Sequence, residues 1–343
     1  MEGTLGGGWL GGPRGRRRWL AAVLVAGTVS CGGSSEPGGN PADRYLGEVL
    51  TLIQQNHIRR SEIDWSAYQR QVRAAAAGAT GLADLDPALQ LAIDLLQDRH
   101  SAICRGQGTC LYQSVQGLGG WVGWSDPGAL PAGVAYVRVD GNSGSSLSRT
   151  QLADRLQAAV QAQDRAGLVG WIVDLRQNGG GDMWPMLAGI GPVLGNGTAG
   201  SFVFPAGTTT PRFAPGATMT WSYSGGAARA DGQPKVSVTV PYALLAPAPR
   251  VAVLQDGGTG SSGEAMAISF IGRPDARSFG AATFGVSSAN LGYSLSDGGT
   301  LQLLVGLDRD RNGTTYGGSV APDVPTEGPA EAVAAAVAWL AGP

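Results

Sequence analysis

Residues 251–270, VAVLQDGGTGSSGEAMAISF, place a serine where a turn meets a helix. The apolar run 251–254 predicts a buried strand, the glycines after it predict a sharp turn, and Ser261 stands where the next helix should begin. Such a turn exposes a serine hydroxyl and directs helix amides toward a developing oxyanion. The S-x-x-E spelling of 261–264 is also that of a capping box, so a helix cap is the alternative.

A serine nucleophile needs a base, and the chain contains two histidines. His100 follows a predicted helix in LLQDRHS (95–101), and the end of an element suits a residue presented to a cleft. His57 lies between polar residues, and we expect it to be a solvated turn residue. An imidazole with a pKa of about 6.5 can take the serine proton at neutral pH.

A second strand, turn and helix are predicted in 169–190, VGWIVDLRQNGGGDMWPMLAGI. A buried strand covers 169–175, a glycine turn covers 178–181, and a short helix begins at Asp182. The turn lacks the Lys-Ser/Thr of a phosphate-binding loop. It is either a tight crossover turn or a row of amides that faces the serine turn.

Composition limits the classes of partner. The 343 residues include 56 Gly and 20 Pro, and the 43% hydrophobic content is enough for a folded core in a loop-rich chain. The net charge of −2 offers no basic face for phosphates, so we expect no nucleic acid partner.

The first residues have the pattern of an export signal. Arginines at 14 and 16–18 precede the apolar run 19–30, which is too short to span a bilayer. We therefore interpret 1–30 as a signal peptide and 31–42 as a Gly/Ser/Pro-rich tether. Cys31 resembles the cysteine of a bacterial lipobox, although Thr28 stands where leucine is usual. The expected location is the periplasm, or the membrane through a lipid on Cys31.

Two cysteines remain, Cys104 and Cys110, in CRGQGTC. In an oxidising compartment a local disulfide is the economical interpretation. A zinc pair is the alternative, but the chain has no second Cys/His pair to complete four ligands. We expect the disulfide, with no metal and no cofactor.

The remaining periodicities divide the chain into a helical domain, 43–103, and a core domain, 104–343. Apolar spacing predicts three helices in the first, the third beginning at Asp86-Pro87. In the second, the pattern predicts strands at 119–124 and 133–140, a helix at 148–166, a strand-and-loop insert at 196–249, strands with a hairpin turn at 296–299, and a final helix at 330–342.

Five segments together resemble the tail-specific or C-terminal-processing serine peptidase superfamily: LLQDRHS (95–101), DLRQNGGG (174–181), TGSSGE (259–264), TFGVSSAN (283–290) and VAPDV (320–324). The branch looks like tricorn protease and the interphotoreceptor retinoid-binding protein repeats. The resemblance implies an α/β fold with a crotonase/ClpP-like ββα core after a small N-terminal helical domain. Only some thirty residues separate His100 from the GVAYVRV strand, so we expect no PDZ domain.

The resemblance also implies roles for residues. Ser261 would be the nucleophile, His100 the general base, and the backbone N–H groups of Gly180 and Ser262 would hold the oxyanion. Serine–lysine members carry a lysine where this chain has Val286, and the only lysine, Lys235, lies elsewhere. The implied type is therefore Ser-His, not Ser-Lys.

The group that orients the histidine is left open. Tricorn-like members have a glutamate near their Gly-Val-x-Pro-Asp segment, where this chain has Tyr316. Tyr316 or an aspartate at 308 or 310 could serve, with solvated turn carboxylates as the alternative for Asp308 and Asp310. The predicted function is an exported serine peptidase acting on peptides or unfolded proteins. A non-catalytic peptide- or lipid-binding module is the alternative, and the oligomeric state is not predicted.

Overall fold

The structure is a computed structural model that describes residues 40–106, 108–113, 119–205 and 216–342. The predicted signal peptide, Cys31 and most of the tether lie outside these residues. The helices are α1 (Pro41–Asn56), α2 (Trp65–Ala75), a 3₁₀ turn (Leu82–Leu85), α3 (Asp86–Leu96), α4 (Arg149–Gln163), α5 (Met183–Leu194), α6 (Ser262–Phe270) and α7 (Pro329–Ala341). Within the described ranges, every helix is too short or too polar to cross a membrane.

The strands form two sheets. One is parallel, in the order β13 (Val324–Pro325), β10 (Ala276–Gly280), β9 (Arg250–Gln255), β4 (Gly170–Asp174) and β3 (Val134–Arg138). The other is antiparallel, in the order β2 (Cys110–Tyr112), β1 (Ala102–Cys104), β12 (Thr300–Arg309), β5 (Gly197–Val203), β6 (Thr218–Ser224), β7 (Ala227–Ala230) and β8 (Gln233–Ser237), with β11 (Ser288–Ser294) on β12.

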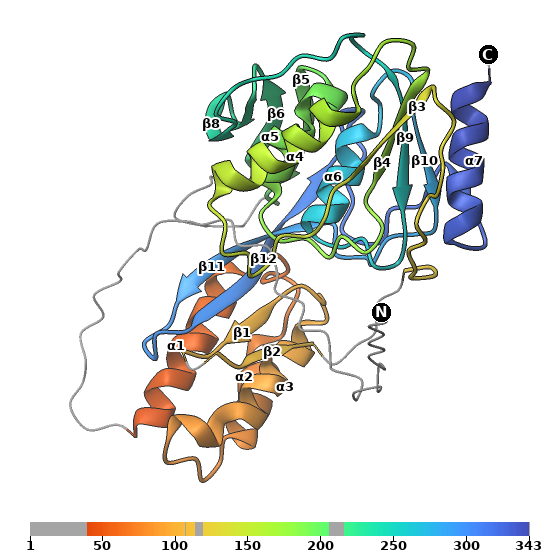
Figure 1. Cartoon of the computed structure of the whole chain (residues 1–343). Coiled ribbons are helices and arrows are strands. Elements are labelled where there is room, and N and C mark those ends of the chain that lie inside the picture. Colours follow the sequence, from red (N-terminus) through yellow and green to blue (C-terminus); the bar gives the residue numbers. More distant parts are fainter. Residues whose placement is uncertain (1–39, 107, 114–118, 206–215, 343) are drawn as a thin grey trace, which may run out of the picture.

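The parallel sheet is covered on both faces, as its nearly continuous apolar strands require. Ile172 and Leu254 point toward α7 and share a core with Leu340. Val173 and Val253 point the other way, into the core that contains α4, α5 and α6. Figure 1 shows these three helices between the two sheets and α7 on the outer face. The parallel strands thus end beside α5 and α6, which begin directly after the two predicted turns.

One long hairpin joins the N-terminal helical region to the rest of the molecule. Strands β11 and β12 are antiparallel around the predicted turn at 296–299. The first residues of β12, 300–302, pair with β1, and its last residues, 307–309, pair with β5. In Figure 1 the hairpin runs from the sheets down to helices α1–α3. The hairpin therefore holds the N-terminal helical region against the part of the molecule that carries Ser261.

The predicted helical region shares its core with this hairpin. Ile103 of β1 and Leu301 and Leu303 of β12 are fully buried in one cluster with the apolar faces of α1, α2 and α3. The boundary expected after residue 103 falls inside β1. The third helix begins at Asp86-Pro87, as predicted.

Segment 119–124 was predicted to be a strand, and this prediction is wrong. Its main chain bonds to loops at the ends of β9 and β10 instead of to a strand. Gly120 donates to the Ala282 carbonyl, and the Trp121 carbonyl accepts from Gly257. Gly119 approaches Thr283 and Gly257 too closely for any side chain. The alternating sequence of 119–124 therefore reflects contacts with the loops at the strand ends and not strand pairing.

The predicted disulfide between Cys104 and Cys110 is present. The two residues face each other in the β1–β2 ladder, where Cys104 pairs with Cys110. The bond closes the short loop at the outer end of this two-strand unit, whose other strand edge is paired with β12.

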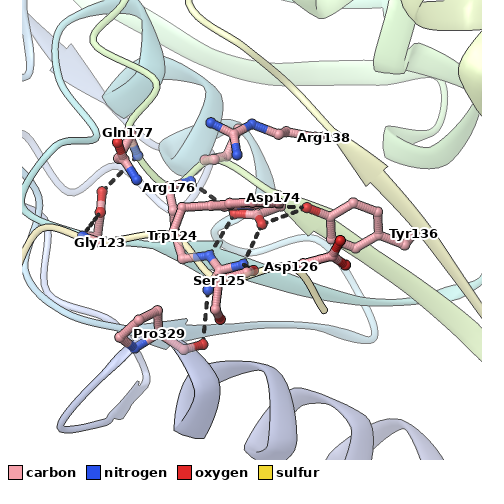
Figure 2. Close-up of polar contacts among 12 residues, drawn as sticks. Gly123, Trp124, Ser125, Asp126, Tyr136, Arg138, Asp174, Arg176, Gln177 and Pro329 are labelled. Atoms are coloured by element: carbon pink, nitrogen blue, oxygen red, sulfur yellow. Dashed lines mark hydrogen bonds and ion pairs between the residues drawn. The ribbon is translucent and has the colours of Figure 1, made fainter. Parts of the chain in front are cut away.

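A fully buried ion pair stands at the carboxyl end of β4, just before the glycine turn (Figure 2). Arg176 donates from Nε and Nη2 to Asp174 at 2.9 and 2.5 Å, and the Tyr136 hydroxyl donates to the same carboxylate at 2.7 Å. The remaining guanidinium bonds reach the carbonyls of Pro329, at the start of α7, and Ser125. The pair thus joins β4, α7 and the segment that crosses the strand ends.

We predict that Arg176→Met destabilises the protein by about 3–5 kcal/mol, because it leaves the buried Asp174 charge without its partner. Arg138→Met is the matched control. Arg138 pairs with Asp140, whose side chain is 71% exposed, so its loss should cost about 1 kcal/mol or less. Urea unfolding of both variants measures the difference, and equal midpoints would contradict the assignment.

Candidate active site

Ser261 lies at the junction of β9 and α6 with a strained backbone. Its φ is 53° and its ψ is −119°, a conformation that non-glycine residues rarely adopt. Strain of this kind costs about 1–3 kcal/mol and persists only where surrounding contacts hold it. The side chain is 6% exposed. The turn therefore presents the hydroxyl at a fixed place, as predicted for a nucleophile.

The buried Glu264 carboxylate supplies the contacts that hold this turn. Its Oε2 accepts from the main-chain N–H groups of Ser261, at 2.8 Å, and Val286, at 2.9 Å. Its Oε1 accepts from the Thr283 hydroxyl, at 2.6 Å, and the Gly285 N–H, at 2.8 Å. Burial raises the pKa of Glu264 to about 7, and the four donors oppose the rise. The capping glutamate thus also fastens the 283–286 loop to the serine turn.

His100 lies against the Ser261 hydroxyl although the two are 161 positions apart in sequence. The distance from His100 Nε2 to Ser261 Oγ is 3.0 Å, and both side chains are buried. This is the separation at which an imidazole can accept the serine proton. The structure therefore brings together the two residues that sequence reasoning selected.

Ser288 contacts the other ring nitrogen of His100. Its Oγ lies 2.7 Å from His100 Nδ1 and 3.4 Å from the Val286 carbonyl. If the Ser288 hydroxyl donates to that carbonyl, its oxygen accepts Nδ1–H and leaves the Nε2 lone pair for Ser261. Sequence reasoning missed Ser288. The only available signal was that it lies in TFGVSSAN, the segment in which lysine is replaced.

None of the three orienting candidates contacts the imidazole. Tyr316 donates its hydroxyl to Asp310 at 2.8 Å, and Asp310 accepts main-chain N–H groups of its own turn. Asp308 is fully buried, and neither oxygen has a donor among the described residues. Burial, and then the charge of Glu264, raise its pKa well above the ordinary value. Of the residues considered for orienting His100, Tyr316 and Asp308 do not contact the imidazole, whereas Ser288, which was not among them, does.

Asp98 fixes the main chain at His100. Its Oδ1 accepts the N–H groups of His100 and Ser101 at 2.9 and 2.8 Å, and its Oδ2 lies 2.8 Å from His57 Nε2. Burial acts to raise the pKa of Asp98, but the bonds from His57 and Ser101 bring it below the ordinary value. His57 is fully buried, so the prediction of a solvated residue is wrong. Its polar neighbours in sequence gave no sign of this partner.

The amides beside Ser261 differ from the expected pair. Gly180 donates its N–H to the Asn178 side chain at 3.0 Å, so this group is already engaged. Ser262, at the first position of α6, and Gly181 have N–H groups without an acceptor among the described residues. The Ser262 hydroxyl donates to the Gly181 carbonyl at 2.7 Å and joins the two turns. Gly181 and Ser262 are therefore the two amides beside Ser261 that remain able to donate to a ligand.

Gly180 has a different role, which is to allow close approach. Its φ is 97°, and a Cβ there would lie 2.9 Å from the Ser261 Cβ. Only glycine fits this position without displacing Ser261.

A small cleft opens at Ser261, His100 and Ser288. Its other lining residues include apolar side chains and one carboxylate: Met183, Trp184, Phe202, Ala265, Ala289 and Asp182. Asp182 pairs with Arg149 at 2.5 Å, so its charge is compensated. In the described part of the chain no group of three or more His, Cys, Asp or Glu side chains is placed to hold a metal ion.

The family follows from the comparison with known proteins. The family model of Peptidase family S41 matches residues 133–326, more than half of the chain. The chain belongs to peptidase family S41. This confirms the predicted superfamily of C-terminal processing peptidases. The matched residues include Ser261 and Ser288, whereas His100 lies before them.

Known relatives of this S41 protein share most of its length. A nisin-resistance protein from Lactococcus lactis subsp. lactis is 26% identical over 298 residues, which cover 87% of this chain and 86% of that protein. A lipoprotein structure from Streptococcus agalactiae has a TM-score of 0.65 at 20% identity, covering 90% of this chain and 99% of that one.

The photosystem II D1 C-terminal processing protease has a TM-score of 0.50 at 14% identity, covering 83% of this chain and 93% of that one. At such low identity these structures establish a shared fold. The mixed α/β fold with a helical N-terminal region is therefore that of S41 peptidases.

We predict that activity of this S41 protein persists to unusually low pH. Burial lowers the pKa of His100 to about 4, and the charge of Asp98 opposes the shift. A general base acts when neutral, so a lowered pKa keeps it active at every pH above that value. Rates on an uncharged peptide measure kcat/KM, whose final acid limb should lie at about pH 4. A step near pH 7 belongs to Glu264, whose pKa burial raises to about 7. Complete loss of activity near pH 6.5 would contradict the burial argument for His100.

We also predict that Ser288→Ala lowers kcat about tenfold and leaves KM nearly unchanged. The variant removes one hydrogen bond, typically about 1 kcal/mol, that selects the productive imidazole tautomer. Ser294→Ala, at the exposed end of the same strand, is the control and should retain full activity. A Ser288→Ala enzyme with unchanged kcat would exclude Ser288 as the orienting residue.

Proposed function

We propose that the chain is an exported serine peptidase that hydrolyses peptide bonds through an acyl-enzyme on Ser261. One observation carries the proposal. A serine held in a strained turn at a helix start has an imidazole nitrogen 3.0 Å from its hydroxyl. Membership of peptidase family S41 supports the same chemistry.

Each proposed step uses one group of this site. His100 Nε2 takes the proton of Ser261 Oγ as the oxygen attacks the peptide carbonyl carbon. The N–H groups of Ser262 and Gly181 hold the carbonyl oxygen as it becomes an oxyanion, each for about 3 kcal/mol. His100 then gives the proton to the departing amine. Water enters, His100 takes a proton from it, and hydrolysis of the ester releases the acid and restores Ser261.

The residues present at the site agree with a histidine base and not with a lysine base. The only lysine, Lys235, lies exposed on β8. Val286, at the position of the lysine in the Ser-Lys members, uses its main-chain N–H to bond Glu264. Ser288 then serves as the positioning residue for His100, in place of the carboxylate that tricorn-like members use.

The relatives support an extracytoplasmic role and a peptide substrate. The Streptococcus agalactiae structure is of a lipoprotein, which agrees with an export signal at 1–30 and a lipid on Cys31. Export would place the protein in the periplasm or anchor it to a membrane. The Lactococcus relative is a nisin-resistance protein, so nisin is the first peptide to assay as a substrate. The largely apolar cleft suits an uncharged side chain next to the scissile bond.

We predict that a fluorophosphonate forms an adduct on Ser261 of the folded protein. His100→Ala should slow the labelling by about 10²–10⁴, because the hydroxyl loses its base. Ser261→Ala should abolish it, and Ser294→Ala should label like the parent. Mass spectrometry of the tryptic peptides locates the adduct.

Two results would overturn the proposal. One is folded protein without an adduct on Ser261, and the other is an adduct whose rate of formation is the same in His100→Ala. Lipid or peptide that co-purifies with unlabelled protein would then favour the non-catalytic binding module.

A further inference from the structure

The carboxamide of Asn290, on β11, uses its nitrogen in a hydrogen bond, whereas its oxygen has no donor among the described residues. Its Nδ2 donates to the main-chain carbonyl of His100 at 2.7 Å. Its Oδ1 is buried and accepts no hydrogen bond from the described residues. The side chain is 3% exposed and lines the same cleft as Ser261 and His100.

The position of Oδ1 follows from the other half of the group. If the amide were flipped, Oδ1 would face the His100 carbonyl oxygen, and two acceptors would repel each other. The bond to His100 therefore holds Oδ1 on the side away from that carbonyl. A buried acceptor without a donor is costly, so such a group in a cleft indicates a donor supplied by a ligand.

We propose that Asn290 Oδ1 accepts a hydrogen bond from the backbone N–H of the substrate residue whose carbonyl Ser261 attacks. The inference rests on the proposed peptidase function. That carbonyl carbon must lie about 3–3.5 Å from Ser261 Oγ, with its oxygen at the Ser262 and Gly181 amides. The N–H of the same residue is two bonds away, so it stays within the small cleft that Asn290 lines.

A backbone donor fits this cleft better than a donor side chain. Apart from Asp182, whose charge is paired with Arg149, the cleft walls include the apolar side chains of Met183, Phe202 and Ala265. A backbone N–H is present in every residue except proline and does not depend on the side chain. Asn290 would thus fix the register of any peptide and exclude proline at the position before the scissile bond.

The test replaces one atom of the substrate and leaves the protein unchanged. A peptide is compared with its depsipeptide, in which an ester oxygen replaces the N–H of the residue before the scissile bond. Cleavage at the scissile amide is followed by mass spectrometry. For the parent enzyme we predict that kcat/KM falls tenfold or more with the ester, because a buried acceptor is left unpaired.

Two variants separate the proposed substrate contact of Asn290 Oδ1 from the hydrogen bond that Asn290 Nδ2 donates to the His100 carbonyl. In Asn290→Ala the ratio of amide to ester rates should fall to about one, because the acceptor is gone. Asn290→Asp keeps an acceptor and loses the donor to the His100 carbonyl, so it should be slower yet still prefer the amide. Moving the ester one residue farther from the scissile bond is the substrate control and should not respond to Asn290.

Failure of the Asn290 proposal can be distinguished from failure of the proposed peptidase function. A fluorophosphonate carries no peptide N–H, so its adduct on Ser261 reports the nucleophile independently of Asn290. Labelling together with equal amide-to-ester ratios in parent and Asn290→Ala overturns the Asn290 role alone. So does an Asn290→Ala effect confined to substrates with a donor side chain. Absence of both labelling and hydrolysis overturns the peptidase function and this inference with it.

Discussion

Four hydrogen bonds to one buried carboxylate hold the site together. Glu264 accepts from the strained main chain of Ser261 and from three donors in the 283–286 loop. The loop leads directly into β11, which carries Ser288 and Asn290. A single side chain therefore sets both the main-chain conformation of Ser261 and the start of the strand that faces His100. Its burial makes the bonds strong, because water does not compete for them.

The distance in sequence between His100 and Ser261 is closed by the β11–β12 hairpin. The hairpin shares a core with helices α1–α3 and also pairs with β5 beside the parallel sheet. The two parts of the molecule thus meet along continuous strand pairing. Asp98, itself held by buried His57, then fixes the main chain after α3, at His100. The precision of the Ser261–His100 contact is a property of this shared framework.

The electrostatics of the site differ from those of a triad with a carboxylate. Ser288 is neutral, and it can orient the imidazole but cannot stabilise an imidazolium as a charge would. Asp308 is fully buried, and burial, followed by the charge of Glu264, raises its pKa. It makes no hydrogen bond to the imidazole. Asp98 favours the imidazolium through its charge but bonds the main chain. The surroundings of His100 consequently favour its neutral form.

The sequence by itself determined the local chemistry. Turn glycines, strand periodicity and the start of a helix located Ser261, and the presence of only two histidines and one lysine limited the choice of base. The disulfide and the hairpin turn were also predictable, because each depends on residues a few positions apart. The family resemblance added the order of the motifs.

Tertiary structure decided every contact between distant segments. Three features depend on where segments from different elements meet. They are the contact of Ser288 with His100, the bond from the Gly180 N–H to Asn178, and the Asn290 oxygen that has no donor among the described residues. The burial of His57 and the role of segment 119–124 have the same origin. Periodicity reports which face of an element is apolar, but it carries no information on which polar atom lies opposite. That pairing exists only once the chain has folded.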